Sequence, residues 1–271
     1  MRQSVGELDI ADALEELYSA YNRREYVHPD PLEFLYGYDD PADREIVALI
    51  ASSLAYGRVA QILANVSRVL ERMPSPRRFI ERASAQSLGE KFRDIKHRFT
   101  TGDEIAGLFF GVKRAVKKYG SLHACFVKGI CDTGETVVSA LASFARELRG
   151  EAGGSCGTLI PDPTGGSALK RLNLFLRWMV RKDAVDPGGW DSISASKLVV
   201  PLDTHMHKIG LALGFTRRAQ ADMKTALEIT AAFGKIRPDD PVRYDFALTR
   251  LGIRNDLDKK AFFARCGAGA K

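Results

Sequence analysis

Residues 41–73 read PADREIVALIASSLAYGRVAQILANVSRVLERM, and their apolar positions recur with the period of an α-helix. One face of the first half carries Ile46, Leu49, Ile50 and Leu54. This i, i+3, i+4, i+8 spacing is typical of an amphipathic helix. Pro41 suits the first helical position, where its missing N–H needs no partner. The stretch therefore predicts two helices joined by a short break at 55–58.

The rest of the chain repeats this helical pattern, and alternating strand–helix units are absent. Only Leu198–Val200 resembles a strand, and glycine and proline residues concentrate in a connector at 150–168. The fold class that we expect is all-α. The further helices are expected near residues 8–24, 76–83, 86–98, 103–118, 121–129, 133–149, 170–180, 203–213, 218–233 and 239–252.

Composition excludes several classes of protein. The chain has 271 residues, and 40 Lys and Arg against 34 Asp and Glu give a formal charge of +6. This excess permits an anionic partner such as nucleic acid without requiring one. No apolar run approaches the roughly 20 residues of a membrane span. The four cysteines lack the close spacing of zinc ribbons and iron–sulfur ligands, so we expect no metal and no cofactor.

One candidate site begins with VPLDTHMHKIG at 200–210. A carboxylate at the start of a helix accepts hydrogen bonds from the free N–H groups there, and these bonds hold it ionised. Asp203 stands at such a position after Pro201. A cap is the ordinary role of a lone Asp, but the polar residues gathered around Asp203 favour a functional one.

The second candidate is PTGGSALKR at 163–171. A glycine-rich turn that opens a helix exposes N–H groups able to bind phosphate. Lys170 follows this turn at the edge of the apolar face of the next helix. Partial desolvation there would favour a neutral, nucleophilic amine. Most single lysines are solvated cations, and a glycine turn alone is a weak signal.

Together these segments resemble a known superfamily. The stretch 200–214, VPLDTHMHKIGLALG, is similar to the aspartate segment of helix-hairpin-helix (HhH-GPD) DNA glycosylases, which include endonuclease III. The chain as a whole resembles an uncharacterised bacterial branch of that superfamily over most of residues 40–255. The segments that carry this resemblance are KRLN at 170–173, RWMVR at 177–181 and DPVRYDFA at 240–247.

Two departures narrow the resemblance. Lys170 and Asp203 are thirty-three residues apart, where endonuclease III-like enzymes have about eighteen, and the iron–sulfur cysteines are missing. Archaeal 8-oxoguanine DNA glycosylases are the nearer match in lysine–aspartate layout. Lys182 is a competing nucleophile, and we favour Lys170 because only it follows a glycine turn at a helix start.

The resemblance implies a DNA repair glycosylase that flips a damaged base, with an oxidised purine as the first expectation, out of double-stranded DNA. Asp203 would stabilise the cationic sugar, and Lys170 would form a Schiff base that also permits AP-lyase cleavage. The expected DNA-binding residues are Tyr56, Arg58, Gly165, Gly166, Ser167 and Arg171. Trp178, Trp190 and Phe175 are expected to line the base pocket, with burial in the core as the alternative, and Arg177, Arg181 and Lys182 to approach phosphates.

The resemblance also implies two helical subdomains, 36–182 ending in the hairpin and 183–271 with 1–35, and an active site in the groove between them. We expect the first helix to pack on the C-terminal helices, in a cytoplasmic, nucleoid-associated monomer. Two other functions stay open: a non-catalytic helix-hairpin-helix DNA-binding protein, and a metal-dependent hydrolase. The hydrolase would use Asp203, His205 and His207, which share a face on a strand but not on a helix.

Overall fold

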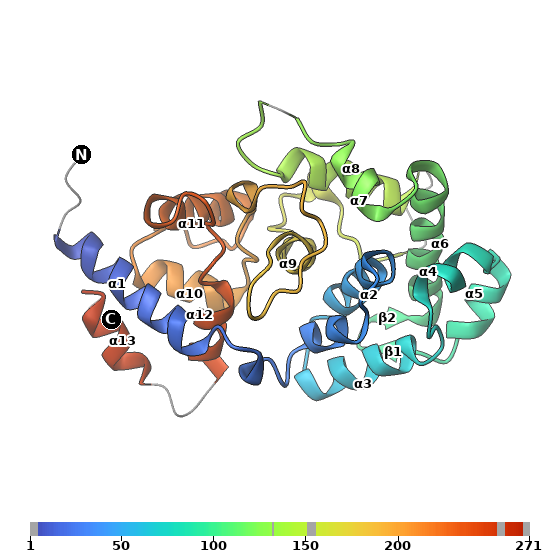
Figure 1. Ribbon diagram of the computed structural model, residues 1–271, viewed down its shortest axis with the longest axis horizontal. Helices are drawn as coiled ribbons and strands as arrows, with labels where there is room; N and C mark the ends of the chain where they lie inside the picture. The colour runs from blue at the N-terminus through green and yellow to red at the C-terminus, as the bar shows by residue number, and fades with distance from the viewer. Residues whose placement is uncertain (1–4, 132, 151–155, 254–257, 268–271) are drawn as a thin grey trace.

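The computed structural model describes residues 5–131, 133–150, 156–253 and 258–267. It is mostly helical, which confirms the all-α class (Figure 1). Part of the glycine-rich connector, residues 151–155, lies outside the described residues. No helix in the described part of the chain is long and apolar enough to cross a membrane.

The first half of the chain contains eight α-helices and one hairpin within its described residues. The helices are α1 (Val5–Tyr21), α2 (Pro41–Ser53), α3 (Val59–Leu70), α4 (Pro76–Arg82), α5 (Ala85–Phe92), α6 (Gly102–Tyr119), α7 (Leu122–Val127) and α8 (Val138–Arg149). The hairpin joins β1 (Lys96–His97) to β2 (Thr100–Thr101), and two 3₁₀ helices, η1 (Arg24–Tyr26) and η2 (Pro31–Gly37), precede α2.

The second half is helical over its described elements and more irregular between them. These elements are η3 (Pro163–Gly165), α9 (Lys170–Val180), η4 (Ala195–Lys197), α10 (Thr204–Ala212), α11 (Met223–Ile236), α12 (Asp245–Ile253) and α13 (Lys259–Arg265). The expected strand at Leu198–Val200 is not formed. Those residues are buried coil, and the Val200 N–H donates to Thr230 Oγ1 at 3.0 Å instead of to a neighbouring strand.

Helix α2 starts as its sequence predicts. The Asp40 side chain accepts a hydrogen bond from the Ala42 N–H, and Pro41 occupies the first helical turn. The helix is buried along most of its length and packs against α9. Helix α9 lies in the middle of the molecule, with α2 to α8 on one side and α1 and α10 to α13 on the other (Figure 1).

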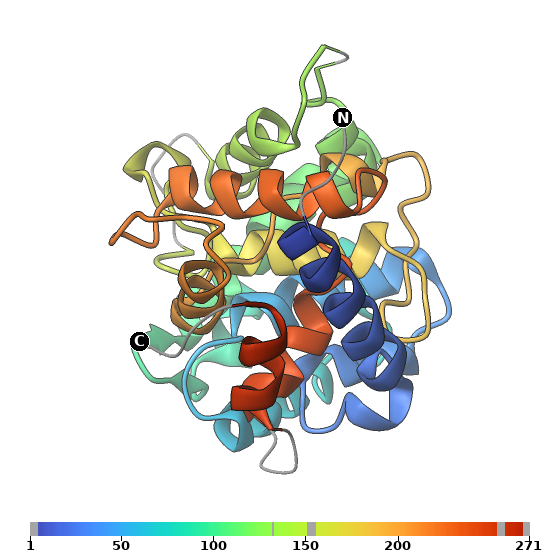
Figure 2. The same ribbon diagram turned by 90° about the vertical axis from the view of Figure 1, so that its left-hand side faces the viewer.

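The first helix packs on the C-terminal helices, as expected. Helix α1 contacts α12 and α13, and Figure 2 shows it lying across them. Tyr244 donates its hydroxyl hydrogen to Glu15 Oε1 at 2.6 Å, and Arg265 forms an ion pair with Glu16. These contacts join the two ends of the chain; the division at residues 35 and 182 stays a prediction.

The helix expected over 86–98 is wrong beyond Phe92, over nearly half of its length. Helix α5 ends at Phe92, and residues 96–101 form the β1–β2 hairpin, with His97 opposite Thr100. The next helix explains part of this turn. Thr101 and Glu104 form a capping box at the start of α6, so the chain must be extended just before it. Periodicity alone did not reveal this interruption.

Candidate functional site

Lys170 is the first residue of α9, at the helix start that its sequence predicts. The residue before it, Leu169, has left-handed backbone (φ +48°) although it is not a glycine. This conformation costs about 1–2 kcal/mol for an L-residue, and it persists only where surrounding contacts impose it. The Leu169 side chain is buried, and Asn173 Nδ2 donates to the Ala168 carbonyl at 3.0 Å. These contacts set the direction in which the helix begins.

Asp203 is the N-cap of α10, also as predicted. Its Oδ1 atom accepts hydrogen bonds from the N–H groups of His205 at 2.9 Å and Met206 at 2.8 Å. Its Oδ2 atom lies 3.7 Å from Lys170 Nζ. One oxygen therefore orients the carboxylate and the other faces the amine. The two side chains are 32% and 41% exposed, so the pair is open to a solvent-borne molecule.

The Ala55–Arg58 break between α2 and α3 lies beside this pair. Lys170 Nζ is 3.5 Å from the Ala55 carbonyl oxygen, at the outer limit of a hydrogen bond. Arg171 Nη1 donates to the Ser53 carbonyl at 2.7 Å, and its guanidinium carbon lies 5.1 Å from the centroid of the Tyr56 ring. Burial lowers the pKa of Arg171. Arg171 thus holds the start of α9 against the end of α2, and its bonds go to protein carbonyls rather than into solvent.

Tyr56 is an anchor for the hairpin. Its hydroxyl donates to the His97 carbonyl at 2.9 Å and lies 2.7 Å from Thr100 Oγ1. These bonds hold the hydroxyl end of Tyr56 against the hairpin, and its expected contact with DNA stays a prediction. Gly57 has a positive φ of +100°, which turns the chain, and the Arg58 side chain is exposed.

His97 connects the β1–β2 hairpin to the Tyr56 segment and to α3 through both of its ring nitrogens. Nε2 lies 2.9 Å from the Tyr56 carbonyl oxygen and therefore donates to it. Nδ1 lies 3.1 Å from Asn65 Nδ2 and must accept, so the ring is neutral in this arrangement. Burial lowers the pKa of His97 below its ordinary 6.5.

We expect acidification to destabilise this junction. The unfolded chain binds the His97 proton at a higher pH than the folded chain, so this contribution is fully present above about pH 6.5. It is lost as the pH falls towards the lowered pKa of the folded state. Urea unfolding at pH 7.5 and 5.5 should show a smaller pH-dependent loss of stability for His97→Gln than for wild type. An equal loss would contradict this role.

The three aromatic residues expected in a base pocket are in the core. Trp178, Trp190 and Phe175 are each at most 1% exposed. Phe175 and Trp190 form a T-shaped pair with ring centroids 5.0 Å apart, and Trp190 Nε1 donates to Glu45 Oε2 at 3.2 Å. The structure therefore corrects the pocket assignment: these rings are already covered by protein and do not face a ligand.

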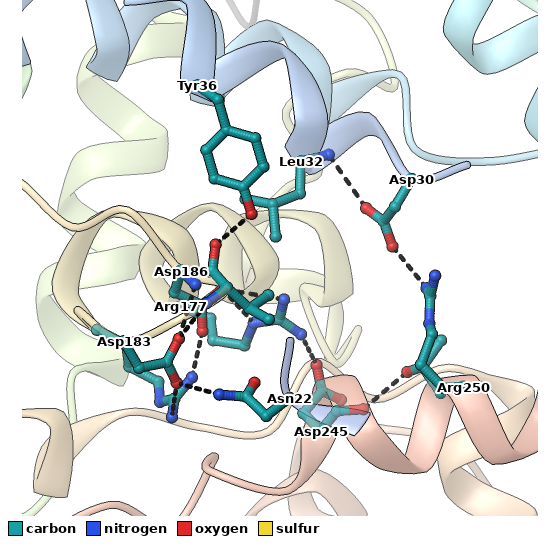
Figure 3. A network of polar contacts seen from close by, with 12 residues as sticks. Asn22, Asp30, Leu32, Tyr36, Arg177, Asp183, Asp186, Asp245 and Arg250 are labelled. Atoms are coloured by element: carbon teal, nitrogen blue, oxygen red, sulfur yellow. Dashed lines mark hydrogen bonds and ion pairs between the residues drawn. The ribbon is translucent and has the colours of Figure 1, made fainter. Parts of the chain in front are cut away.

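Arg177 and Arg181 do not approach phosphates, because both belong to a buried ion-pair network. Figure 3 labels Arg177 and its partners Asp186 and Asp245. Arg177 contacts Asp186 at 3.1 Å and also Asp245, while Arg181 contacts Asp183, Asp186 and Asp240. Burial acts to lower the pKa of each arginine, but the carboxylates outweigh it and raise the pKa. Both side chains remain charged inside the protein.

The glycine turn is exposed but does not itself begin α9. Gly165, Gly166 and Ser167 are followed by buried Ala168 and Leu169 before the helix starts. The Gly166 carbonyl accepts from the Met223 N–H at 3.1 Å, and Ser167 forms a β-bridge with Asp222. The turn is tied to the start of α11, and its expected role in phosphate binding stays a prediction.

The residues of the alternative hypotheses, Lys182 as nucleophile and His205 and His207 as metal ligands, have different surroundings. Lys182 is exposed beyond α9, where it forms a β-bridge with Pro187, whereas Lys170 is the lysine that meets Asp203. His205 and His207 lie on α10, and His207 Nε2 is 2.8 Å from the Arg218 carbonyl oxygen. Within the described ranges, no three His, Cys, Asp or Glu side chains are grouped to hold a metal ion. This arrangement does not favour the metal-dependent hydrolase.

Comparison with known proteins places the chain in a family. The family model described as "Protein of unknown function (DUF2400)" matches residues 30–254. The chain belongs to this family. No curated protein and no solved structure matches it. The expected membership of the helix-hairpin-helix DNA glycosylase superfamily is therefore wrong, because the model that covers most of the chain is that of a different, uncharacterised family.

Two features of the site region were missed by sequence reasoning. The sequence analysis assigned no role to the carboxylates of Asp186 and Asp245, which pair with Arg177. The available signal was the i, i+4 spacing of Arg177 and Arg181 on one helix face, since a buried arginine needs acidic partners. The Arg98–Phe99 turn was hidden inside an expected helix. The available signal in the sequence was RDIKHRF at 93–99, where three basic residues precede one phenylalanine.

Proposed function

We propose that this protein is a DNA N-glycosylase with an associated lyase activity, with Lys170 as nucleophile and Asp203 as the essential carboxylate. The observation that carries the proposal is the approach of Lys170 Nζ to Asp203 Oδ2, 3.7 Å apart and open to solvent. A lysine amine attacks electrophilic carbon to form a Schiff base, and an adjacent carboxylate stabilises positive charge on a sugar. Lys170 and Asp203 supply such an amine and such a carboxylate at one position.

The proposed reaction uses Lys170 as a neutral amine. Its lone pair forms a bond to C1′ of the nucleotide, and the glycosidic C1′–N bond breaks with its electron pair leaving on the base. The proton lost by the amine passes to Asp203 Oδ2, the neighbouring carboxylate, and from there to the departing base. The C1′–O4′ bond then breaks as the nitrogen lone pair forms the C1′=N imine bond, and the remaining amine proton passes to the ring oxygen. The Asp203 carboxylate, free again, would take the 2′ proton while the 3′ phosphate leaves with the electron pair of its C3′–O bond, which cleaves the strand. Water would then hydrolyse the imine and release Lys170 as the amine.

Double-stranded DNA containing a damaged base is the proposed partner. The surplus of positive charge and the exposed Arg58 beside the pair support an anionic polymer as substrate. The expectation of an oxidised purine depended on the superfamily resemblance alone, and the proposal does not extend to a particular lesion.

We further propose that the pair lies between two helical subdomains, 36–182 and 183–271 with 1–35. Lys170 comes from the first and Asp203 from the second, and α9 lies between the two groups of helices (Figure 1). A single chain supplies both groups, so the proposal needs no second copy.

The proposal is tested by covalent trapping. Duplexes carrying an abasic site, or one of a panel of damaged bases, are incubated with the protein and borohydride, which reduces a Schiff base to a stable amine. Wild-type protein should become linked to DNA, and Lys170→Gln should lose at least tenfold of the linked product. Lys182→Gln is the matched control, since Lys182 is an exposed lysine just beyond the same helix, and it should trap as wild type does.

Three outcomes separate the possibilities. Loss of trapping in Lys182→Gln but not in Lys170→Gln would overturn the assignment of the nucleophile. Wild-type protein that binds the duplexes without base release or trapping across the panel would overturn the glycosylase and leave a non-catalytic DNA-binding protein. Stoichiometric zinc with loss of activity in His207→Ala would support the metal-dependent hydrolase instead.

A further inference from the structure

Phe99 stands out from the exposed hydrophobic residues. Its side chain is 78% exposed, while the other large hydrophobics exposed in the described part of the chain, Val59, Val127 and Leu211, are at most 41% exposed. An aromatic ring left in water has a free energy cost that packing would remove. Phe99 sits at the tip of the β1–β2 hairpin, beside Arg98, whose guanidinium carbon is 5.4 Å from its ring centroid.

The hairpin holds this ring on a fixed support. His97 and Thr100, on either side of the turn, are at most 1% exposed and are bonded to the Tyr56 segment. Asn65 on α3 bonds the His97 ring from another side. Arg98 has left-handed backbone (φ +54°), a strained conformation for a residue other than glycine. A two-residue turn anchored on both sides displays Phe99 outward.

The surroundings of Phe99 are cationic. Exposed positive side chains lie on the same segment, at Arg93, Lys96 and Arg98, and the exposed Arg58 follows Gly57, which the Arg98 side chain covers. The neighbouring carboxylate, Asp94, is paired with Arg68 and Arg72 and does not offset them. An exposed aromatic ring with an arginine against it, on a segment with further exposed cations, matches a nucleic acid, in which planar bases alternate with phosphates. An apolar protein surface would match the ring but not the charges.

A continuous set of contacts joins this tip to Lys170. Lys170 Nζ lies 3.5 Å from the Ala55 carbonyl oxygen, and Gly57 is two residues further on. The Arg98 side chain covers Gly57 so closely that a Cβ atom there would lie 2.7 Å from Arg98 Cδ. The turn residue Arg98 therefore packs on the segment that borders Lys170, and we expect a duplex bound at Lys170 to reach this hairpin.

We propose that Phe99 is a DNA contact that stacks on a base, or fills the gap left by one, next to the nucleotide held at Lys170. This inference rests on the proposed function for the identity of the duplex. It assigns the stacking side chain to Phe99 and makes Tyr56 part of its support. Stacking on an opened step offsets part of the energy lost when a base leaves the duplex.

The test is equilibrium binding, which requires no catalysis. A fluorescent duplex with a tetrahydrofuran abasic analogue is titrated with full-length protein at several salt concentrations. Alanine substitution of a stacking aromatic costs about 1–3 kcal/mol, so Phe99→Ala should weaken Kd about 5- to 150-fold. Phe99→Trp should bind within about threefold of wild type. Leu211→Ala, which removes another exposed hydrophobic side chain, should leave Kd unchanged.

The salt dependence separates stacking from charge. Phe99→Ala should keep the wild-type slope of log Kd against log salt, whereas Arg98→Ala should reduce that slope by about one. Wild-type affinity in Phe99→Ala, or absence of duplex binding by wild type, would overturn the inference. If wild type binds without trapping, the catalytic proposal fails while the Phe99 comparison still decides this one.

Discussion

Replacing Asp186 by alanine is expected to lower the free energy of unfolding by about 3–5 kcal/mol. Asp186 is fully buried, and its carboxylate contacts both Arg177, labelled in Figure 3, and Arg181. Its removal leaves two guanidinium groups inside the protein with fewer counter-charges, and their desolvation is no longer compensated. Loss of one partner of a buried ion pair costs far more than the pair itself contributes.

Urea unfolding followed by circular dichroism measures this change. Asp94→Ala is the matched control, because Asp94 also bridges two arginines, Arg68 and Arg72, but is itself 60% exposed. Water solvates the arginines left in that variant, so its urea midpoint should change little. If Asp186→Ala does not fold, the milder Asp186→Asn should still lower the midpoint. Equal midpoints for the Asp186 and Asp94 variants would contradict a structural role for the network.

The Asp203→Asn variant should release a damaged base about 10²- to 10³-fold more slowly than wild type. The lesion is the one that wild-type protein excises in the panel. Asparagine caps helices about as well as aspartate, so α10 should keep its start and the protein its thermal stability. What is lost is the negative charge at Oδ2, 3.7 Å from Lys170 Nζ. The effect therefore reports the charge and the proton-accepting role of the carboxylate rather than folding.

Single-turnover base release, measured together with the unfolding temperature, distinguishes a loss of catalysis from a loss of folding. Asp258→Asn is the control: Asp258 caps α13 by accepting from the Ala261 N–H, and the change there should alter neither quantity. A wild-type rate of base release in Asp203→Asn would remove the carboxylate from the proposed mechanism. A large fall in unfolding temperature would instead mean that the residue acts through the fold.

Local signals predicted part of the site correctly. The start of α9 at Lys170, the cap at Asp203 and Pro41 in the first turn of α2 all follow from short stretches of sequence. Caps and helix starts depend on residues within one turn of each other, so the sequence contains the information needed. The aromatic and arginine assignments failed because burial depends on elements far apart in the chain. Arg177 pairs with Asp245, which is sixty-eight residues away in the sequence, and Trp190 donates a hydrogen bond to Glu45 on α2.

The amino-acid sequence by itself determined the helical class, most helix positions and the orientation of the Asp203 carboxylate, because periodicity and capping act over a few residues. Only the tertiary structure decided which lysine meets Asp203, which aromatic rings are covered and which is left exposed. Those outcomes depend on packing between distant segments: α9 against α2 brings Lys170 to Ala55, and the hairpin against Tyr56 leaves Phe99 in solvent. No local pattern encodes such a contact, since its free energy arises from surfaces that meet only in the folded chain.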